Sequence, residues 1–228
     1  MKILEKICSP LGWLSLGLLG YGIWHVLNTP ADFQQGNSVA ILFVHVSAAK
    51  MALFFYLVLV AASIRYLWKK GDTADTIAEA SVHVGAAFSV VTLATGSIWG
   101  KPMWGTWWAW DARLTSMLML LIIYVGLIAL RGALEDRQRG AKAAAIFALI
   151  GAVDLPLIHF SVVWWRTLHQ PASLGNGAPK LVGPMLTTLA VMGVAFTVLG
   201  TYMLVLKTLE VREQRRLHDK EEEHFHNG

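Results

Sequence analysis

Long apolar stretches, interrupted by short polar segments, occupy most of the chain. A helix needs about 20 apolar residues to cross a bilayer core of about 30 Å, and six stretches approach or exceed that length. They cover about 11–27, 39–65, 77–98, 114–131, 143–165 and 183–206. The pattern predicts an all-α integral membrane protein, a single membrane domain over residues 1–228 with six transmembrane helices and a tail at 207–228.

Composition agrees with this prediction and charge adds an orientation. Hydrophobic residues make up 55% of the 228 positions and charged residues only 15%, which leaves too much apolar surface for a water-soluble fold. Lys and Arg concentrate at the cytoplasmic ends of membrane spans. With alternating helices, 14 of the 19 basic residues share one side: Lys2, Lys6, Arg65, Lys69, Lys70, Arg131, Arg137, Arg139, Lys142, Lys207, Arg212, Arg215, Arg216 and Lys220.

Both termini are therefore predicted to be cytoplasmic, and the longer loops at 28–38, 99–112 and 166–182 to face outward. No small-residue cleavage pattern follows the first apolar stretch, so we expect a retained helix and not a signal peptide. The tail carries His218, His224 and His226 among acidic residues, which is typical of a solvated, partly disordered end rather than a metal site.

Several function classes are disfavoured by what the chain contains. The net charge of +4 comes from residues scattered along the membrane flanks, so nucleic-acid binding is not indicated. Cys8 is the one cysteine and no CxxC or CxxCH motif occurs, which argues against a thiol oxidoreductase or a c-type cytochrome. No phosphate-binding GxxxxGK[ST] loop is present, so any ATP-driven step needs a partner subunit. We predict no enzymatic activity.

A tryptophan-rich segment, WGKPMWGTWWAWDARLTS at 99–116, holds five of the ten tryptophans within twelve residues. Trp104, Trp107, Trp108 and Asp111 are spaced as i, i+3, i+4 and i+7, which predicts a short helix along the membrane interface once Gly100 and Pro102 break the preceding span. One interpretation is the ordinary aromatic belt of membrane proteins. The other is a platform that stacks on a large planar ligand. The segment contributes Trp99, Trp104, Trp107, Trp108 and Trp110.

Two histidines are expected at the same outer surface. His45 lies near the outer end of the second span, and His169 follows the fifth. Two neutral imidazoles beside an aromatic platform match bis-histidine ligation of haem iron. His159 is the rival ligand, about 15 Å below His169 if the helix continues. A buried histidine that only forms packing hydrogen bonds remains the alternative for each of them.

The charged residues of this surface have two interpretations each. Asp111 would repel haem propionates, so its expected role is to cap the fourth helix at the DARL sequence. Lys101, Arg113 and Arg166 are candidate partners of the propionates. Each of these cations is alternatively an interfacial side chain whose charged end reaches toward water.

The runs WGKPMWGTWWAWDARLTS, ADFQQGNS, HVSAA, LPLIHFSVVWW and TLHQ together resemble the cytochrome c maturation protein C (CcmC) family, the haem exporter C proteins of the WWD-domain haem-handling superfamily. The resemblance covers about residues 9–206. It implies a six-helix bacterial inner-membrane protein that holds haem b non-covalently on the periplasmic side. It also implies delivery of that haem to the membrane-anchored chaperone CcmE, together with the ABC-transporter subunits CcmA and CcmB and the small subunit CcmD.

The same resemblance assigns residue roles. It implies that His45 in HVSAA and His169 in TLHQ are the axial ligands of the haem iron. It carries the family's aromatic and acidic cluster over to Trp99, Trp104, Trp107, Trp108, Trp110 and Asp111. Two departures stand out: Ser47 replaces the usual proline of HVPAA, and Lys50 lies inside the membrane below His45. Neither removes a ligand.

Alternatives remain open at this point. A membrane b-type cytochrome would need histidine pairs at depth, such as His45 with His159. A haem permease would need a polar path, for which Lys50, His83 and Asp154 are few and dispersed. Glu79 with His83 is a candidate local pair, and Asp154 with Pro156 is either a kink in the fifth span or the wall of a polar cavity.

Overall fold

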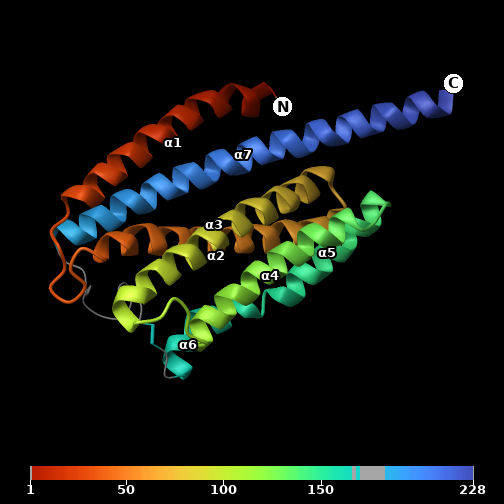
Figure 1. The fold of residues 1–228 in the computed structure, drawn as a ribbon. Helices are drawn as coiled ribbons and strands as arrows, with labels where there is room; N and C mark the ends of the chain where they lie inside the picture. The colour runs from red at the N-terminus through yellow and green to blue at the C-terminus, as the bar shows by residue number, and fades with distance from the viewer. Residues whose placement is uncertain (1, 166–167, 170–182, 228) are drawn as a thin grey trace.

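A computed structural model describes residues 2–165, 168–169 and 183–227, and all regular structure in those ranges is helical apart from one isolated bridge between Asp32 and Gly36. Six helical segments are long and apolar enough to cross a membrane, which confirms the predicted all-α fold class. Figure 1 shows the helices: α1 (Lys2–Asn28), α2 (Val39–Lys69), α3 (Asp72–Trp104), α4 (Ala112–Gly132), α5 (Arg137–Gly151), α6 (Asp154–Trp164) and α7 (Pro184–Asn227).

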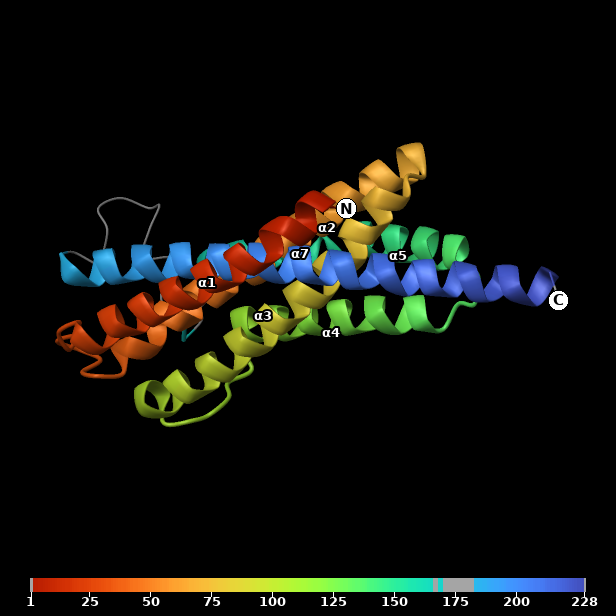
Figure 2. The same cartoon turned by 90° about the horizontal axis from the view of Figure 1, so that it is seen from above.

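The hairpin of α2 and α3 forms the centre of the bundle. Helices α4 and α5 pack against this hairpin on one side, and α7 packs on the other with α1 beside it (Figures 1 and 2). The core lies where α2, α3 and α4 meet. Tyr56 and Tyr124 are fully buried there, with ring centres 5.2 Å apart. Their hydroxyls donate to the carbonyls of Ala148 and Ala52 at 3.0 and 2.8 Å, so their polar ends are satisfied within the apolar interior.

The fifth span consists of two helices. Helix α5 ends at Gly151 and α6 begins at Asp154, with a turn between them. Pro156 lies in the first turn of α6, where its lack of an N–H costs no helix hydrogen bond, and its ring disfavours a regular helix through the preceding turn. The kink interpretation of this region is therefore confirmed. Asp154 is buried beside the break, with its Oδ2 unpartnered among the described residues.

The predicted interfacial helix of the tryptophan-rich segment is wrong. Helix α3 passes through Gly100 and Pro102 and ends at Trp104, and no helix is present from residue 105 to 111. The stop comes from Gly105, whose φ of 77° places it in the left-handed region and whose N–H donates to the carbonyl of Lys101 at 3.0 Å. The remaining tryptophans lie on an irregular connection that leads into α4.

The tail is also more ordered than predicted. Helix α7 continues as one helix to Asn227 instead of ending near residue 206 (Figure 2). Arg215 joins this extension to the first turns of α3, while Lys207–Glu210 and Glu213–Arg216 pairs lie along it at i, i+3 spacing. One long-range anchor, Arg215, and local pairs along the helix therefore support a segment whose composition alone suggests disorder.

An ion cluster ties three helices together at the end of the bundle that carries the chain termini. Arg215 of α7 donates to Asp75 at 2.7 Å and to Glu79 at 2.6 Å, and Arg131 of α4 donates to Asp75 at 2.6 Å. We call these four residues, with Asp72 bound to Arg215 at 2.8 Å, the ion cluster. Glu79 was predicted as a candidate partner of His83, but its ion-pair partners among the described residues are Arg131 and Arg215.

Candidate functional site

The two candidate iron ligands lie together at the end of the bundle opposite the ion cluster. His45 is in the second turn of α2, and its ring centre is 6.1 Å from that of His169 with a tilt of 34°. Two imidazoles that bind one metal atom from opposite sides, each through a bond of about 2 Å, have ring centres roughly 6 Å apart. The arrangement therefore fits an iron atom held between the two rings.

The rival histidine is not part of this pair. His159 lies on α6, is exposed, and has its ring centre 4.7 Å from that of its neighbour Phe160. His45 instead has His169 on one side and α3 on the other, where its Nδ1 is 3.1 Å from both the carbonyl of Thr92 and the hydroxyl of Thr95. The geometry thus favours His169 over His159 as the partner of His45.

Aromatic side chains extend from the histidine pair. Trp104 meets His169 edge to face with ring centres 6.4 Å apart, and Trp99 meets Trp104 in the same way at 5.0 Å. The indole N–H of Trp99 donates to the side-chain oxygen of Gln35 at 3.0 Å. This bond joins the connection between α1 and α2 to the aromatic group. Five side chains, from α2, α3 and two connections, therefore form one continuous series of contacts: His45, His169, Trp104, Trp99 and Gln35.

The other tryptophans of the segment lie on the connection after α3. Trp108 and Trp110 form a pair with ring centres 5.5 Å apart, and Trp107 and Trp110 are 58% and 78% exposed. The indole nitrogen of Trp108 and Oδ2 of Asp111 are buried without hydrogen-bond partners among the described residues. Buried polar groups are normally paired, so an unpaired indole donor next to exposed indoles is suited to an acceptor on a bound molecule.

The charged candidates have different surroundings. Asp111 caps α4 as predicted, because its Oδ1 accepts the N–H of Leu114 at 2.7 Å. Arg113 is partly buried in the first turn of α4 and interacts electrostatically with Asp111 and with His45. It is therefore the candidate cation that acts on a proposed iron ligand. Lys101 is exposed and donates to the carbonyl of Gly105 at 3.2 Å. Arg166 lies outside the described residues.

Three contributors escaped the sequence analysis: Gln35, Thr92 and Thr95. Each lies far along the chain from the residue it contacts. Gln35 lies in the ADFQQGNS run that carries part of the resemblance, but no role was predicted for it, and no motif marks Thr92 or Thr95. The only signal was indirect: Thr92 and Thr95 are polar residues one helical turn apart within an apolar span, which is the spacing expected of a face turned toward another polar group.

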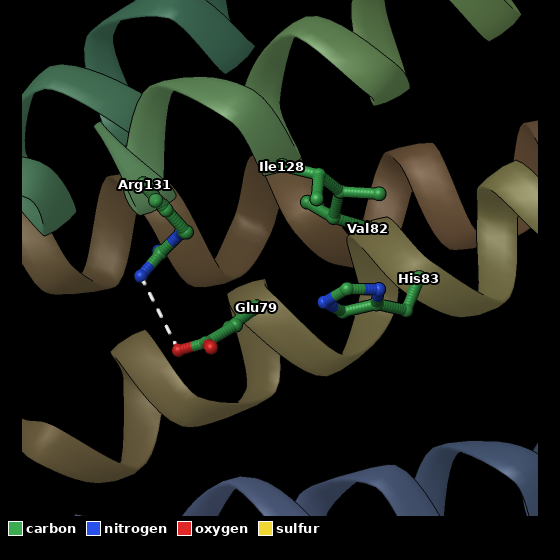
Figure 3. Close-up of a pocket in the computed structure, with 6 residues that line it drawn as sticks. Glu79, Val82, His83, Ile128 and Arg131 are labelled. Carbon is green, nitrogen blue, oxygen red and sulfur yellow. Dashed lines mark hydrogen bonds and ion pairs between the residues drawn. The ribbon is translucent and has the colours of Figure 1, made fainter.

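A cavity of about 240 Å³ lies between α3 and α4 beside the ion cluster. Its lining includes Glu79, His83 and Arg131, with Val82 and Ile128 on the apolar side (Figure 3). Because it belongs to the end of the bundle opposite the paired histidines, it plays no part in the candidate site.

Known proteins are similar in sequence to most of this chain. The family model described as Heme exporter protein C matches residues 1–223. Heme exporter protein C of Bradyrhizobium diazoefficiens is 47% identical over 202 residues, covering 87% of this chain and 77% of the relative. The Escherichia coli K12 protein of the same name is 52% identical over 171 residues, covering 75% and 66%. A putative cytochrome c biosynthesis ccmC-like mitochondrial protein of Marchantia polymorpha is 40% identical over 182 residues, covering 80% and 77%.

The chain belongs to the heme exporter protein C family. This finding confirms the resemblance carried by the tryptophan-rich segment and the two histidine motifs. The heme exporter protein C family is a family of transport components and is not a known enzyme family. Family membership and six apolar helices together identify a multi-pass membrane protein.

Proposed function

We propose that this protein handles haem for cytochrome c biogenesis by holding haem b on the periplasmic face of the bacterial inner membrane. It then delivers the haem to the membrane-anchored chaperone CcmE. The observation that carries the proposal is the pair of imidazoles from His45 and His169, with ring centres 6.1 Å apart at one end of the bundle. Family membership supplies the cargo, because the relatives are named heme exporters.

His45 and His169 bind the iron from opposite sides, and the tryptophans surround the porphyrin. Trp104 contacts His169 directly, so it is next to the ligand plane. Trp107 and Trp110 expose flat apolar faces that suit stacking on a conjugated ring. Arg113 and the unpaired indole N–H of Trp108 are the propionate partners, since both are donors at the same end of the bundle.

The non-covalent binding of haem by this protein suits transfer to another protein better than permanent retention. Non-covalent ligation leaves the haem free to depart, and a chain without a CxxCH motif cannot anchor it through thioethers. Exposed indoles beside the ligands allow an acceptor to approach the haem edge. CcmE is that acceptor, and any ATP-driven step comes from CcmA and CcmB, with CcmD as the small subunit.

An even number of spans implies that both termini lie on the same side of the membrane. The N- and C-termini lie at the same end of the bundle, and the connection after α3 lies at the other (Figure 1). The distribution of Lys and Arg puts the termini, with the 207–228 tail, in the cytoplasm. The outer loops at 28–38, 99–112 and 166–182 then face the periplasm. A b-type electron carrier is less well supported, because it would need histidine pairs at depth and His159 is not paired with His45.

The test uses the full-length protein purified together with CcmE. We expect His45→Ala and His169→Ala each to lose the low-spin bis-histidine optical spectrum and to lower the haem content of co-expressed CcmE. His159→Ala is the matched control, and its spectrum and CcmE loading should equal those of the unaltered protein. Normal spectra in either of the first two variants would refute the ligand assignment. Loss of the bis-histidine spectrum without any decrease in CcmE loading would refute delivery while leaving haem binding in place.

A further inference from the structure

The ring of His45 rests against one face of α3, where three residues within two turns surround it. Its Nδ1 is 3.1 Å from the carbonyl oxygen of Thr92 and 3.1 Å from Oγ1 of Thr95. A side chain at Gly96 would begin 3.2 Å from Cε1 and 3.6 Å from Nδ1 of the same ring. We call Thr92, Thr95 and Gly96 the His45 cradle. The iron-ligand role of His45 rests on the proposed function; the cradle itself is a property of the protein without haem.

We propose that the His45 cradle fixes His45 in the tautomer and orientation that leave Nε2 available as an iron ligand, with Thr95 and Gly96 as positioning residues. No role beyond packing follows for these residues from the family's motifs.

The hydrogen-bond donors determine the tautomer. The carbonyl oxygen of Thr92 can only accept a hydrogen bond. The hydroxyl of Thr95 has one hydrogen, and it lies 2.7 Å from the carbonyl of Val91 and 3.1 Å from that of Thr92. Its single hydrogen is thus directed to its own helix, and Oγ1 acts as an acceptor toward the ring. Both partners of Nδ1 are acceptors, so Nδ1 carries the hydrogen of the neutral imidazole.

The tautomer decides which nitrogen can bind metal. With hydrogen on Nδ1, the lone pair of the neutral ring is on Nε2, at the edge directed away from the two threonines. A histidine that binds metal through one nitrogen commonly donates its other N–H to a carbonyl, which fixes the ring and makes it a stronger electron donor. His45 has this arrangement before any haem is bound, with the Thr95 hydroxyl as a second acceptor.

Gly96 sets the distance between the ring and α3. A contact of 3.2 Å between a new Cβ and Cε1 is tighter than ordinary van der Waals spacing, so Ala at this position would push the ring away. That movement would lengthen both Nδ1 hydrogen bonds. Gly96 matters here because of the close approach of the ring and not because of the backbone conformation.

The first measurement uses the haem-free protein. In the unaltered chain labelled with ¹⁵N-histidine, we expect the His45 signals of a neutral imidazole with hydrogen on Nδ1, assigned by their absence in His45→Ala. Signals of the opposite tautomer, or of an exchanging mixture, would overturn the proposal. This result does not depend on haem, so it separates failure of the cradle from failure of the proposed function. If the tautomer is as expected but His45→Ala binds haem normally, the ligand assignment fails and the cradle stands.

The second measurement compares variants loaded with haem. Thr95→Val removes one acceptor, and we expect a 10- to 100-fold weaker haem affinity, in the range found for outer partners of metal-bound histidines. Its reduction potential should rise, since a weaker donor favours ferrous iron, and Thr95→Ser should restore both values. Thr197→Val is the matched control, because that exposed hydroxyl of α7 likewise donates to the carbonyl four residues earlier. Unchanged affinity and potential in Thr95→Val would overturn the positioning role, as would a spectrum of Gly96→Ala identical to that of the unaltered protein.

Discussion

Replacing Arg215 by Gln should be among the more damaging substitutions at the terminal end of the bundle. Its side chain is 11% exposed, and its guanidinium donates to Asp75, Glu79 and Thr76 at 2.7, 2.6 and 3.0 Å. Asp75 is only 5% exposed, so its charge cannot be hydrated if Arg215 is lost. The substitution leaves a buried carboxylate with Arg131 as its remaining partner.

The magnitude follows from burial. Removing one member of a buried ion pair costs about 3–5 kcal/mol, because the other charge stays desolvated. The contact with Asp72 adds little, since that carboxylate is 59% exposed and screened by water. For a chain of this size each kcal/mol moves the melting temperature by about 2–4 °C. We therefore expect Arg215→Gln to lower it by roughly 6–20 °C.

Arg216→Gln is the matched control. Arg216 is the next residue, 55% exposed, and pairs with Glu213 one helical turn away. Such exposed pairs contribute about 0.2–1 kcal/mol, so the control should melt within a few degrees of the unaltered protein. The assay is thermal unfolding of the detergent-purified protein, followed by loss of the monodisperse peak in size-exclusion chromatography. Equal shifts for the two variants would show that burial of the ion cluster does not contribute to stability.

Two further substitutions test packing and capping. Gly151→Ala should lower stability by about 1–3 kcal/mol, because its Cβ would collide with the hydroxyl of buried Tyr56. Gly193→Ala has open space within α7 and should be neutral or stabilising by up to about 1 kcal/mol in the same unfolding assay. Asp111→Ala should cost about 0.5–2 kcal/mol by removing the cap of α4, with faster hydrogen exchange at the amide of Leu114. Unchanged exchange at that amide would contradict the capping role.

The features that sequence analysis predicted correctly depend on local rules. A run of apolar residues must be long enough to cross the bilayer wherever it lies, so the six spans could be predicted without knowing how they pack. The same holds for Asp111, because an N-cap depends only on the following turn. Pro156 disfavours a regular helix through the preceding turn, which is why the kink between α5 and α6 could be anticipated, although Pro102 lies inside α3 without ending it.

The failures arise where the outcome depends on distant contacts or on one backbone angle. The helical spacing from Trp104 to Asp111 was real, but Gly105 in the left-handed conformation ends the helix before the spacing has any effect. Arg215 meets Asp75 across 140 positions, and no periodicity signals such a pairing. The histidines among acidic residues suggested a partly disordered tail, because the partners of Arg215 on α3 cannot be seen in local composition.

The length of α7 has a consequence for whatever meets its C-terminal end. At about 1.5 Å per residue, its 44 residues extend roughly 66 Å, about twice the thickness of a bilayer core. A partner that binds this end meets it at a fixed distance along the helix axis and in a fixed rotation about that axis. Adding one residue beyond Arg215 turns everything distal by about 100°, whereas adding seven nearly restores the original facing and only raises the height. The rotation of its residues about the helix axis, as well as its length, therefore determines which side chains this helix presents to a partner.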